Sequence, residues 1–215
     1  MAKSKNLFSV SGKVGNVVFY ERFGKTYVRT KPVYIKRKNK TEGQLITQKR
    51  FKLASKIIRS LLPLIRKTYK EVKETGSPYH KAIGQTIQYA FRGETAEELS
   101  LDIRFLPIAY GSLSPLNSLK VQESEEKTNR MELQWDAGMG DSLDQLCFIQ
   151  LGHKANGEFV GMKHFETEIL RKDGLGVFDV NQLWNFPKAY LFAYFKNEKK
   201  GKNSPSSFIK EFDFE

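Results

Sequence analysis

Residues 41–92 have the hydrophobic pattern of amphipathic helices. Apolar side chains recur every three or four residues from Ala54 to Ile65, and residues at this spacing share one face of a helix. Thr41 and Gln44 have the spacing of a capping box, in which each side chain satisfies a free backbone donor of the other residue. The pattern therefore predicts that a long helix begins at this point.

Two breaks are predicted in the helical segment, which we expect to extend to about Lys73. Pro63 has no backbone N–H and clashes with the preceding helical turn, so it predicts a kink or a division after residue 61 or 62. Ser77 followed by Pro78 is typical of a helix start, because proline is well tolerated in the first turn. A second helix is therefore predicted from there to about residue 91.

The segments on either side of the helices have strand patterns. Residues 12–34 contain two β-branched and aromatic runs around Arg22-Phe23-Gly24-Lys25, which predicts a β-hairpin with Gly24 at positive φ. From about residue 112, short apolar runs alternate with Gly- and Asn-rich turns. The predicted strands are residues 119–122, 131–135, 146–152, 158–162, 165–170, 176–180, 189–197 and 207–214. The run 189–197 is apolar on both faces, so we expect it to be a central strand.

Two resemblances to known families add to this interpretation. The C-terminal half resembles a fibronectin type III or related immunoglobulin-like sandwich, on the basis of Leu133-x-Trp135, a strand that begins at Tyr190 after Pro187, and a last strand entered through Asn203-Ser204-Pro205-Ser206. The N-terminal part resembles an uncharacterised bacterial family of unknown function, on the basis of Gly12-Lys13-Val14-Gly15-Asn16-Val17-Val18, Gly24-Lys25-Thr26-Tyr27-Val28-Arg29, and Thr41-Glu42-x-Gln44 with Gln48-x-Arg50-Phe51. That family implies no established activity and supplies no functional residue.

The pattern and the resemblances together predict an α+β chain. A basic region of a β-hairpin and two or three helices is expected over residues 1–111. An all-β immunoglobulin-like, fibronectin type III-like sandwich is expected over residues 112–215.

Charge divides the chain unevenly. The net charge of the 215 residues is +12, from 36 basic and 24 acidic side chains. Residues 1–92 hold 22 basic and four acidic residues, a net charge of +18, whereas residues 93–215 hold 14 and 20, a net charge of −6. An anionic partner of the N-terminal part is one explanation for this asymmetry.

A basic stripe lies opposite the apolar face of the predicted long helix. Its members, which are the candidate contacts to an anion or a nucleic acid, are Lys49, Lys52, Lys56, Arg59, Arg66, Lys70 and Lys73. Such a stripe could neutralise several phosphates of a nucleic-acid backbone without reading its sequence. It could equally be the solvated outer face of an amphipathic helix, although Glu–Lys pairs at i,i+4 are rare in this segment. Both interpretations stay open at this point.

Few residues offer catalytic or metal-binding chemistry. His80, His153, His164 and Cys147 are the only soft metal ligands, and their spacing matches no zinc motif. Cys147 lies in an apolar run, where it is expected to be a small buried hydrophobe. We therefore expect no enzymatic activity, no metal site, no cofactor and no small-molecule substrate.

The sequence predicts a non-enzymatic binding or structural protein. Protein–protein contacts, with another protein or with a second copy, are expected through the sandwich and the basic helical layer. The alternative is a sequence-independent nucleic-acid-binding protein that uses the basic helix over residues 49–73. No apolar run approaches the roughly 20 residues that cross a bilayer, and no signal peptide is evident, so we expect a cytoplasmic protein without a membrane role.

Overall fold

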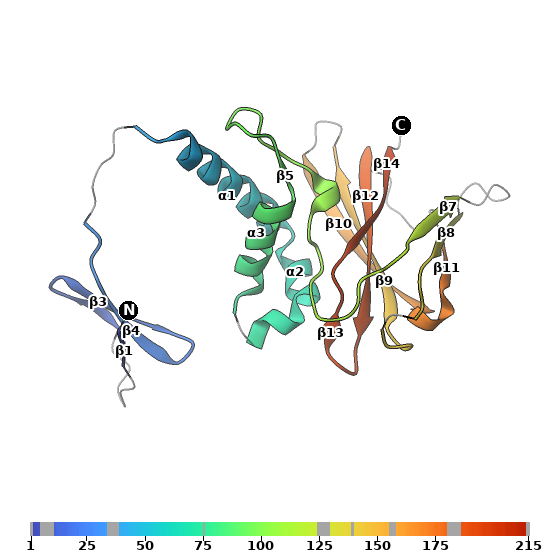
Figure 1. The fold of residues 1–215 in the computed structure, drawn as a ribbon, viewed down its shortest axis with the longest axis horizontal. Coiled ribbons are helices and arrows are strands. Elements are labelled where there is room, and N and C mark those ends of the chain that lie inside the picture. The colour runs from blue at the N-terminus through green and yellow to red at the C-terminus, as the bar shows by residue number, and fades with distance from the viewer. Residues whose placement is uncertain are drawn as a thin grey trace. The chain divides into compact units, whose positions relative to one another are not determined.

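The computed structural model describes residues 2–4, 11–33, 39–74, 76–123, 130–138, 140–154, 158–179 and 186–213. Contacts within the chain divide it into two compact units, residues 1–40 and residues 41–215. Helices and strands occur in the order that the sequence predicts, so the α+β class is confirmed (Figure 1).

The first unit is a four-stranded antiparallel sheet with the strand order β1-β4-β3-β2. Its strands are β1 (Ala2–Ser4), β2 (Gly12–Val14), β3 (Val17–Arg22) and β4 (Lys25–Thr30). The predicted hairpin is confirmed as β3 and β4, with Arg22 directly opposite Lys25 at the turn. Phe23 and Gly24 between them both have positive φ, 52° and 66°, which is the geometry of a type I′ turn.

The second unit begins with the helical layer, which consists of α1 (Glu42–Ser60), α2 (Leu62–Thr68), the 3₁₀ helix η1 (Lys70–Glu74) and α3 (Pro78–Tyr89). The predicted capping box is present. The hydroxyl of Thr41 accepts from the backbone N–H of Gln44 at 3.4 Å, and the Gln44 side-chain oxygen accepts from the N–H of Thr41 at 3.2 Å. The predicted division is also present, because Leu61 ends α1 and Pro63 lies in the first turn of α2.

The start of α3 agrees with the prediction in position but not in every contact. Ser77 is the N-cap residue with an extended backbone, and Pro78 is the first helical residue. The hydroxyl of Ser77 makes no capping hydrogen bond. The fixed φ of Pro78 therefore marks this helix start more than the serine hydroxyl does.

Two sheets follow the helices. Their strands are β7 (Lys120–Glu123), β8 (Arg130–Gln134), β9 (Gln145–His153), β10 (Phe159–Leu170), β11 (Leu175–Asp179), β12 (Lys188–Asn197), β13 (Lys202–Asn203) and β14 (Ser207–Asp213). The larger sheet has the order β10-β9-β12, with β13 and β14 both paired to β12, and the smaller sheet has the order β11-β8-β7. Shorter elements precede and link them: β5 (Phe91–Arg92), β6 (Ser100–Leu101), η2 (Ile103–Phe105) and η3 (Arg171–Asp173).

One prediction about the strands is wrong. Residues 158–162 and 165–170 were expected as two strands but form the single strand β10. Lys163 and His164, the polar pair between the two apolar runs, stay in register with Gln150 and Ile149 of β9. Pairing with β9 continues through this point, so the local loss of apolar character does not end the strand.

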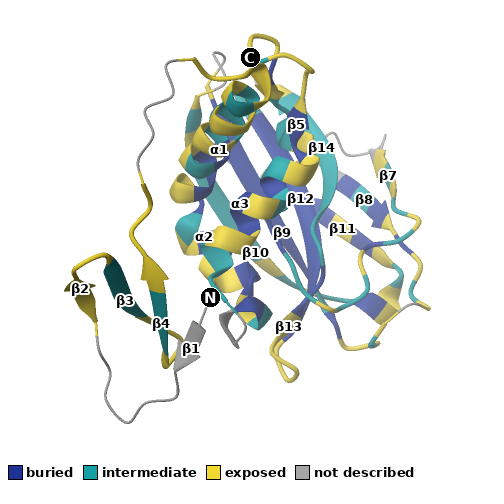
Figure 2. Ribbon diagram, turned by 60° about the vertical axis from the view of Figure 1, so that its left-hand side comes forward, coloured by how far each residue is buried: buried dark blue, intermediate teal, exposed yellow. Residues whose placement is uncertain are grey.

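Strands β9 and β12 are buried on both faces, which confirms that residues 189–197 form a central strand. One face packs against the helices, and its buried residues are Cys147, Ile149, Leu151, Tyr190, Phe192 and Tyr194. The other face packs against the smaller sheet, and its buried residues are Leu146, Phe148, Leu191, Ala193 and Phe195. The second unit is therefore a β-sandwich with a helical layer on the outer face of its larger sheet (Figure 2).

The helical layer and the sandwich are also joined by a set of polar contacts. The carboxylate of Glu71 in η1 accepts from the backbone N–H groups of Ser112, at 2.9 Å, and Asn203, at 3.3 Å. The side-chain amide of Asn203 donates to the carbonyl of Thr68 at 2.9 Å. Gly111 passes so close that a Cβ there would collide with the Asn203 carbonyl and the Glu71 carboxylate. The predicted boundary between residues 111 and 112 lies within this joint, and it stays a prediction as a boundary between domains.

Candidate interaction surfaces

The predicted basic stripe is only partly available to a ligand. Lys52, Lys56, Arg59, Arg66 and Lys70 are exposed. Lys49 is half-buried, and its ammonium group donates to the backbone carbonyls of Ala96 and Glu97. The side chain of Lys73 lies outside the described residues.

The exposed cations of the stripe face different neighbours. Arg59 and Arg66 line one pocket, together with Tyr79 at the start of α3. Lys56 lines another pocket, beside Glu158 near the β9–β10 end of the larger sheet. The structure thus brings two of the seven predicted residues into one pocket, because α1 lies next to α3 on one side and next to the sheet on the other.

Most of the net positive charge lies in residues 1–40, a shorter segment than the basic part that ends at residue 92. Residues 1–40, the first unit, hold 11 basic residues and one acidic residue, a net charge of +10. Residues 41–215, the second unit, hold 25 basic and 23 acidic residues, a net charge of +2. The first sheet therefore belongs to the strongly basic unit, whereas the long helix belongs to a unit that is nearly neutral.

An aromatic groove of about 540 Å³ lies between α3, η2 and the start of β14. Its lining residues are Gln85, Tyr89, Arg104, Phe105, Leu106, Pro107, Ala109, Tyr110, Pro205, Ser206 and Phe208. Tyr89 and Phe105 keep 52% and 50% of their surface exposed, which is high for large aromatic side chains. No local sequence pattern indicated this groove, because its walls come from three separate segments of the chain.

The groove lies beside a sheet edge. Among the described strands, β14 pairs only with β12. Just before β14, the backbone N–H of Ser206 donates to the carbonyl of Ala109 at 3.2 Å, and the Ser206 hydroxyl accepts from the N–H of Ile108 at 3.1 Å. These bonds, one from the backbone and one to the side chain of Ser206, hold residues 108 and 109 beside the start of the strand.

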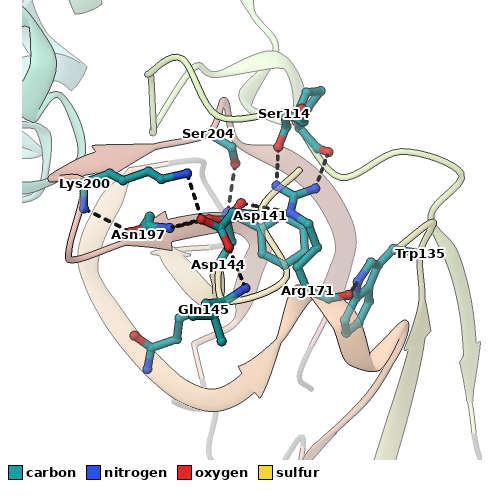
Figure 3. Close-up of polar contacts among 12 residues, drawn as sticks. Ser114, Trp135, Asp141, Asp144, Gln145, Arg171, Asn197, Lys200 and Ser204 are labelled. Atoms are coloured by element: carbon teal, nitrogen blue, oxygen red, sulfur yellow. Dashed lines mark hydrogen bonds and ion pairs between the residues drawn. The ribbon is translucent and has the colours of Figure 1, made fainter. Parts of the chain in front are cut away.

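The most deeply buried charges lie at one end of the sandwich (Figure 3). Arg171 of η3 and Asp144 are 1% and 0% exposed, and their Nε and Oδ2 atoms are 3.0 Å apart. The guanidinium of Arg171 also donates to the carbonyl of Ser114 at 2.6 Å and lies 3.8 Å from the centre of the Phe195 ring. The indole N–H of Trp135 donates to the Arg171 carbonyl at 2.8 Å.

This network continues toward the surface. Asp144 accepts from the side-chain amide of Asn197 at 2.8 Å, and Asp141 lies 2.7 Å from the ammonium group of Lys200. The hydrogen bond from Lys200, followed by that from the backbone of Leu143, holds the pKa of Asp141 below its ordinary value. These charged groups contact one another and nearby polar groups of the protein, so the network joins segments of the fold.

Cys147 and His153 lie in β9, and His164 lies in β10. Burial raises the pKa of the Cys147 thiol to about 12, so it stays protonated at neutral pH and is a poor nucleophile. His164 Nε2 lies 2.9 Å from the Tyr194 hydroxyl. His153 of β9 is paired with Phe159 of β10, whereas His164 of β10 is paired with Ile149, which lies four positions from His153 along β9. Among the described residues, no group of three His, Cys, Asp or Glu side chains is placed to hold a metal ion.

Within the described part of the chain, no helix combines the length and the apolar character needed to cross a bilayer.

Comparisons with known proteins identify the family of the chain. A search of curated proteins found no match. Similar solved structures include the fibronectin type III domain of the human collagen alpha-1(XX) chain, at 13% identity and a TM-score of 0.32, over 48% of this chain and 86% of that one. The third fibronectin III domain of the human KIAA0343 protein is similar at 13% identity and a TM-score of 0.31, over 47% and 82% of the two chains. A family model described as a family of unknown function, DUF6266, matches residues 9–167; since this is more than half of the chain, the protein belongs to that family.

Proposed function

We propose that the protein is a non-enzymatic binding protein that holds an extended segment of a partner protein in the aromatic groove beside β14. The observation that carries this proposal is the half-exposed pair of aromatic side chains, Tyr89 and Phe105, in one groove. Exposed apolar side chains that gather in one place commonly mark interaction sites.

The aromatic walls of the groove and the neighbouring sheet edge suit an extended peptide. Extended segments bind either by adding a strand to a free sheet edge or by packing into grooves lined with aromatic residues. Here a sheet edge, β14, and aromatic walls occur together. Tyrosine and phenylalanine supply large contact areas with few rotatable bonds, so little entropy is lost when they are immobilised.

Cations near the groove favour a bound segment that carries negative charge. The guanidinium of Arg92 lies 4.2 Å from the centre of the Phe105 ring, and the ammonium group of Lys81 lies 4.9 Å from that of Tyr110. Arg104 is already paired with Asp102 at 2.9 Å. We therefore expect the bound segment to combine aromatic or aliphatic side chains with acidic ones.

The non-enzymatic part of the proposal is supported by the state of the reactive groups. The thiol of Cys147 is buried and its pKa is raised. The buried charges of Arg171 and Asp144 satisfy one another and nearby backbone groups. An acid, a base and a nucleophile are needed together in a cleft for most hydrolytic or transfer chemistry, and these groups are committed to the fold instead.

Selection of peptides by the 215-residue chain tests the proposal. A display library of random peptides should yield binders that contain aromatic and acidic residues. Phe105→Ser and Tyr89→Ser should each weaken a selected peptide about tenfold, as truncation of a central aromatic contact typically does.

The matched control is a pair of equally exposed apolar residues on the smaller sheet. Leu175 and Val177 of β11 are 45% and 46% exposed, and Leu175→Ser with Val177→Ser should leave the peptide affinity unchanged. Enrichment of no peptide, or equal binding by the Phe105→Ser variant, would reject the groove as a binding site.

A further inference from the structure

One face of the first sheet carries cations and aromatic rings together. Successive side chains of a strand point to opposite faces, and the registers of β2, β3 and β4 align the residues of one face in rows. We call this surface the basic–aromatic face, and its members are Lys13, Tyr20, Arg22, Lys25, Tyr27 and Arg29.

Two tyrosines form the centre of the basic–aromatic face. Tyr20 and Tyr27 are directly opposite one another on β3 and β4, with ring centres 5.4 Å apart and ring planes inclined by 17°. The guanidinium of Arg29 lies 5.8 Å from the centre of the Tyr20 ring. Both tyrosines are half-buried, so part of each residue remains exposed.

The cations of this face lie on both sides of the tyrosines and repel one another. Arg22 and Lys25 form a direct cross-strand pair at one end of the face, and like charges placed opposite each other destabilise a sheet. Arg29 and Lys13 both flank Val18 at the other end. All four cations are exposed, and within the described residues none of them has a carboxylate at ion-pair distance.

The acidic residue of this unit does not relieve the repulsion. Glu21, the one acid among residues 1–40, lies between Tyr20 and Arg22 in β3 and opposite Thr26. It therefore projects from the other face of the sheet. The basic–aromatic face thus keeps its full positive charge, and a polyanion bound there would remove the repulsion between Arg22 and Lys25.

We propose that the basic–aromatic face binds single-stranded nucleic acid, with the four cations on phosphates and the tyrosine pair on bases. A positive surface with aromatic rings is the combination that binds single strands without sequence preference, because every base offers a face for stacking. A duplex keeps its bases stacked on one another and would leave the rings unused. This site is independent of the groove beside β14 and of the helix cations.

Fluorescence anisotropy with the 215-residue chain and a labelled oligo(dT) strand tests the proposal. Binding should weaken as salt rises, because the cations release counterions from the phosphates. Lys13→Gln combined with Arg29→Gln should reduce the slope of log Kobs against log salt by about 1.4, which is about 0.7 for each lost phosphate contact. Both positions are exposed, so this variant should fold normally.

The matched control removes the same charge from the predicted helix stripe. Lys52→Gln combined with Lys56→Gln lowers the net charge by two as well, but it should leave the salt slope unchanged. If the helix variant loses affinity while the sheet variant does not, the proposal is wrong. Absence of any anisotropy change at low salt also overturns it, and neither result bears on peptide binding in the groove.

Stacking is tested separately from charge. Tyr27→Phe keeps the ring and should bind within about twofold of the original protein, whereas Tyr27→Thr should lose about tenfold, since stacking of one base on an aromatic ring is worth about that much. An unlabelled single strand should also compete better than a duplex or polyglutamate of equal charge. Equal competition, or an unchanged affinity of Tyr27→Thr, would show a general polyanion surface and reject the proposal.

Discussion

Arg171 and Asp144, 27 positions apart in the chain, form an ion pair that is almost completely shielded from water, with Nε and Oδ2 3.0 Å apart. Removing one partner from such a pair leaves an uncompensated buried charge, which typically costs 3–5 kcal/mol, as an order of magnitude. We expect Asp144→Ala to lower the free energy of unfolding by about 3 kcal/mol or more, as measured by urea denaturation.

The exposed end of the same network provides the control. Lys200 keeps 53% of its side chain exposed beside Asp141, and exposed ion pairs of this kind contribute little to stability. Lys200→Gln should therefore change the free energy of unfolding much less than Asp144→Ala does. Similar small effects of both substitutions would contradict a structural role for the buried pair.

Stability should depend on the ionisation of Glu71. Burial opposes ionisation of this carboxyl, but the hydrogen bonds from Ser112 and the backbone of Asn203 outweigh it, so the pKa is lowered from its ordinary value of 4.5. A lowered folded-state pKa stabilises the fold above the unfolded-state value, and this contribution is lost as the pH falls from about 4.5 through the folded-state pKa.

Denaturation at a series of pH values measures this contribution. Glu71→Gln keeps the size of the side chain but cannot ionise, so the difference in stability from the original protein should be largest near neutral pH and shrink below pH of about 4.5. A difference that stays constant over the acidic range would contradict the proposed role of the Glu71 carboxylate.

The two helix starts should respond differently to the loss of a hydroxyl. Thr41→Ala removes the hydroxyl that accepts from the Gln44 N–H and should destabilise the protein by about 1 kcal/mol, as N-cap substitutions do. Ser77→Ala removes a hydroxyl that makes no capping bond and should have a much smaller effect. Thermal unfolding followed by circular dichroism compares the two, and a larger effect at Ser77 would contradict the capping assignment.

Cys147 should be unreactive in the folded protein. Its side chain is fully buried and its pKa is raised to about 12, so thiolate is scarce at pH 8 and the sulfur is inaccessible. Ellman's reagent should label the thiol only after denaturant is added. Rapid labelling of the folded protein at pH 8 would show that the strand around Cys147 opens readily.

Local sequence signals predicted much of this fold. Thr41 with Gln44, and Pro63 within the apolar helix pattern, located one helix start and one helix division correctly, because capping and proline chemistry act within a few residues. The apolar character of Leu191 and Phe192 on successive positions likewise identified a strand buried on both sides.

Contacts between segments that are far apart in the sequence could not be predicted from such local patterns. Lys49 is an exposed cation by helical periodicity, yet its ammonium group contacts carbonyls near residue 96. The salt bridge of Arg171 with Asp144 and the groove at Tyr89 and Phe105 also arise from tertiary packing. The charge of the first sheet was visible in the sequence, but its importance became clear only when residues 1–40 proved to be a separate compact unit.

Because β9 and β12 are buried on both faces, the sandwich depends on the helices that cover its larger sheet. A fragment that began at residue 112 would expose Ile149, Leu151 and Phe192 to water, together with neighbouring residues that the helices now cover. Such a surface would favour aggregation over autonomous folding. We therefore expect that a fusion or truncation that preserves the sandwich will need residues 41–111 as well.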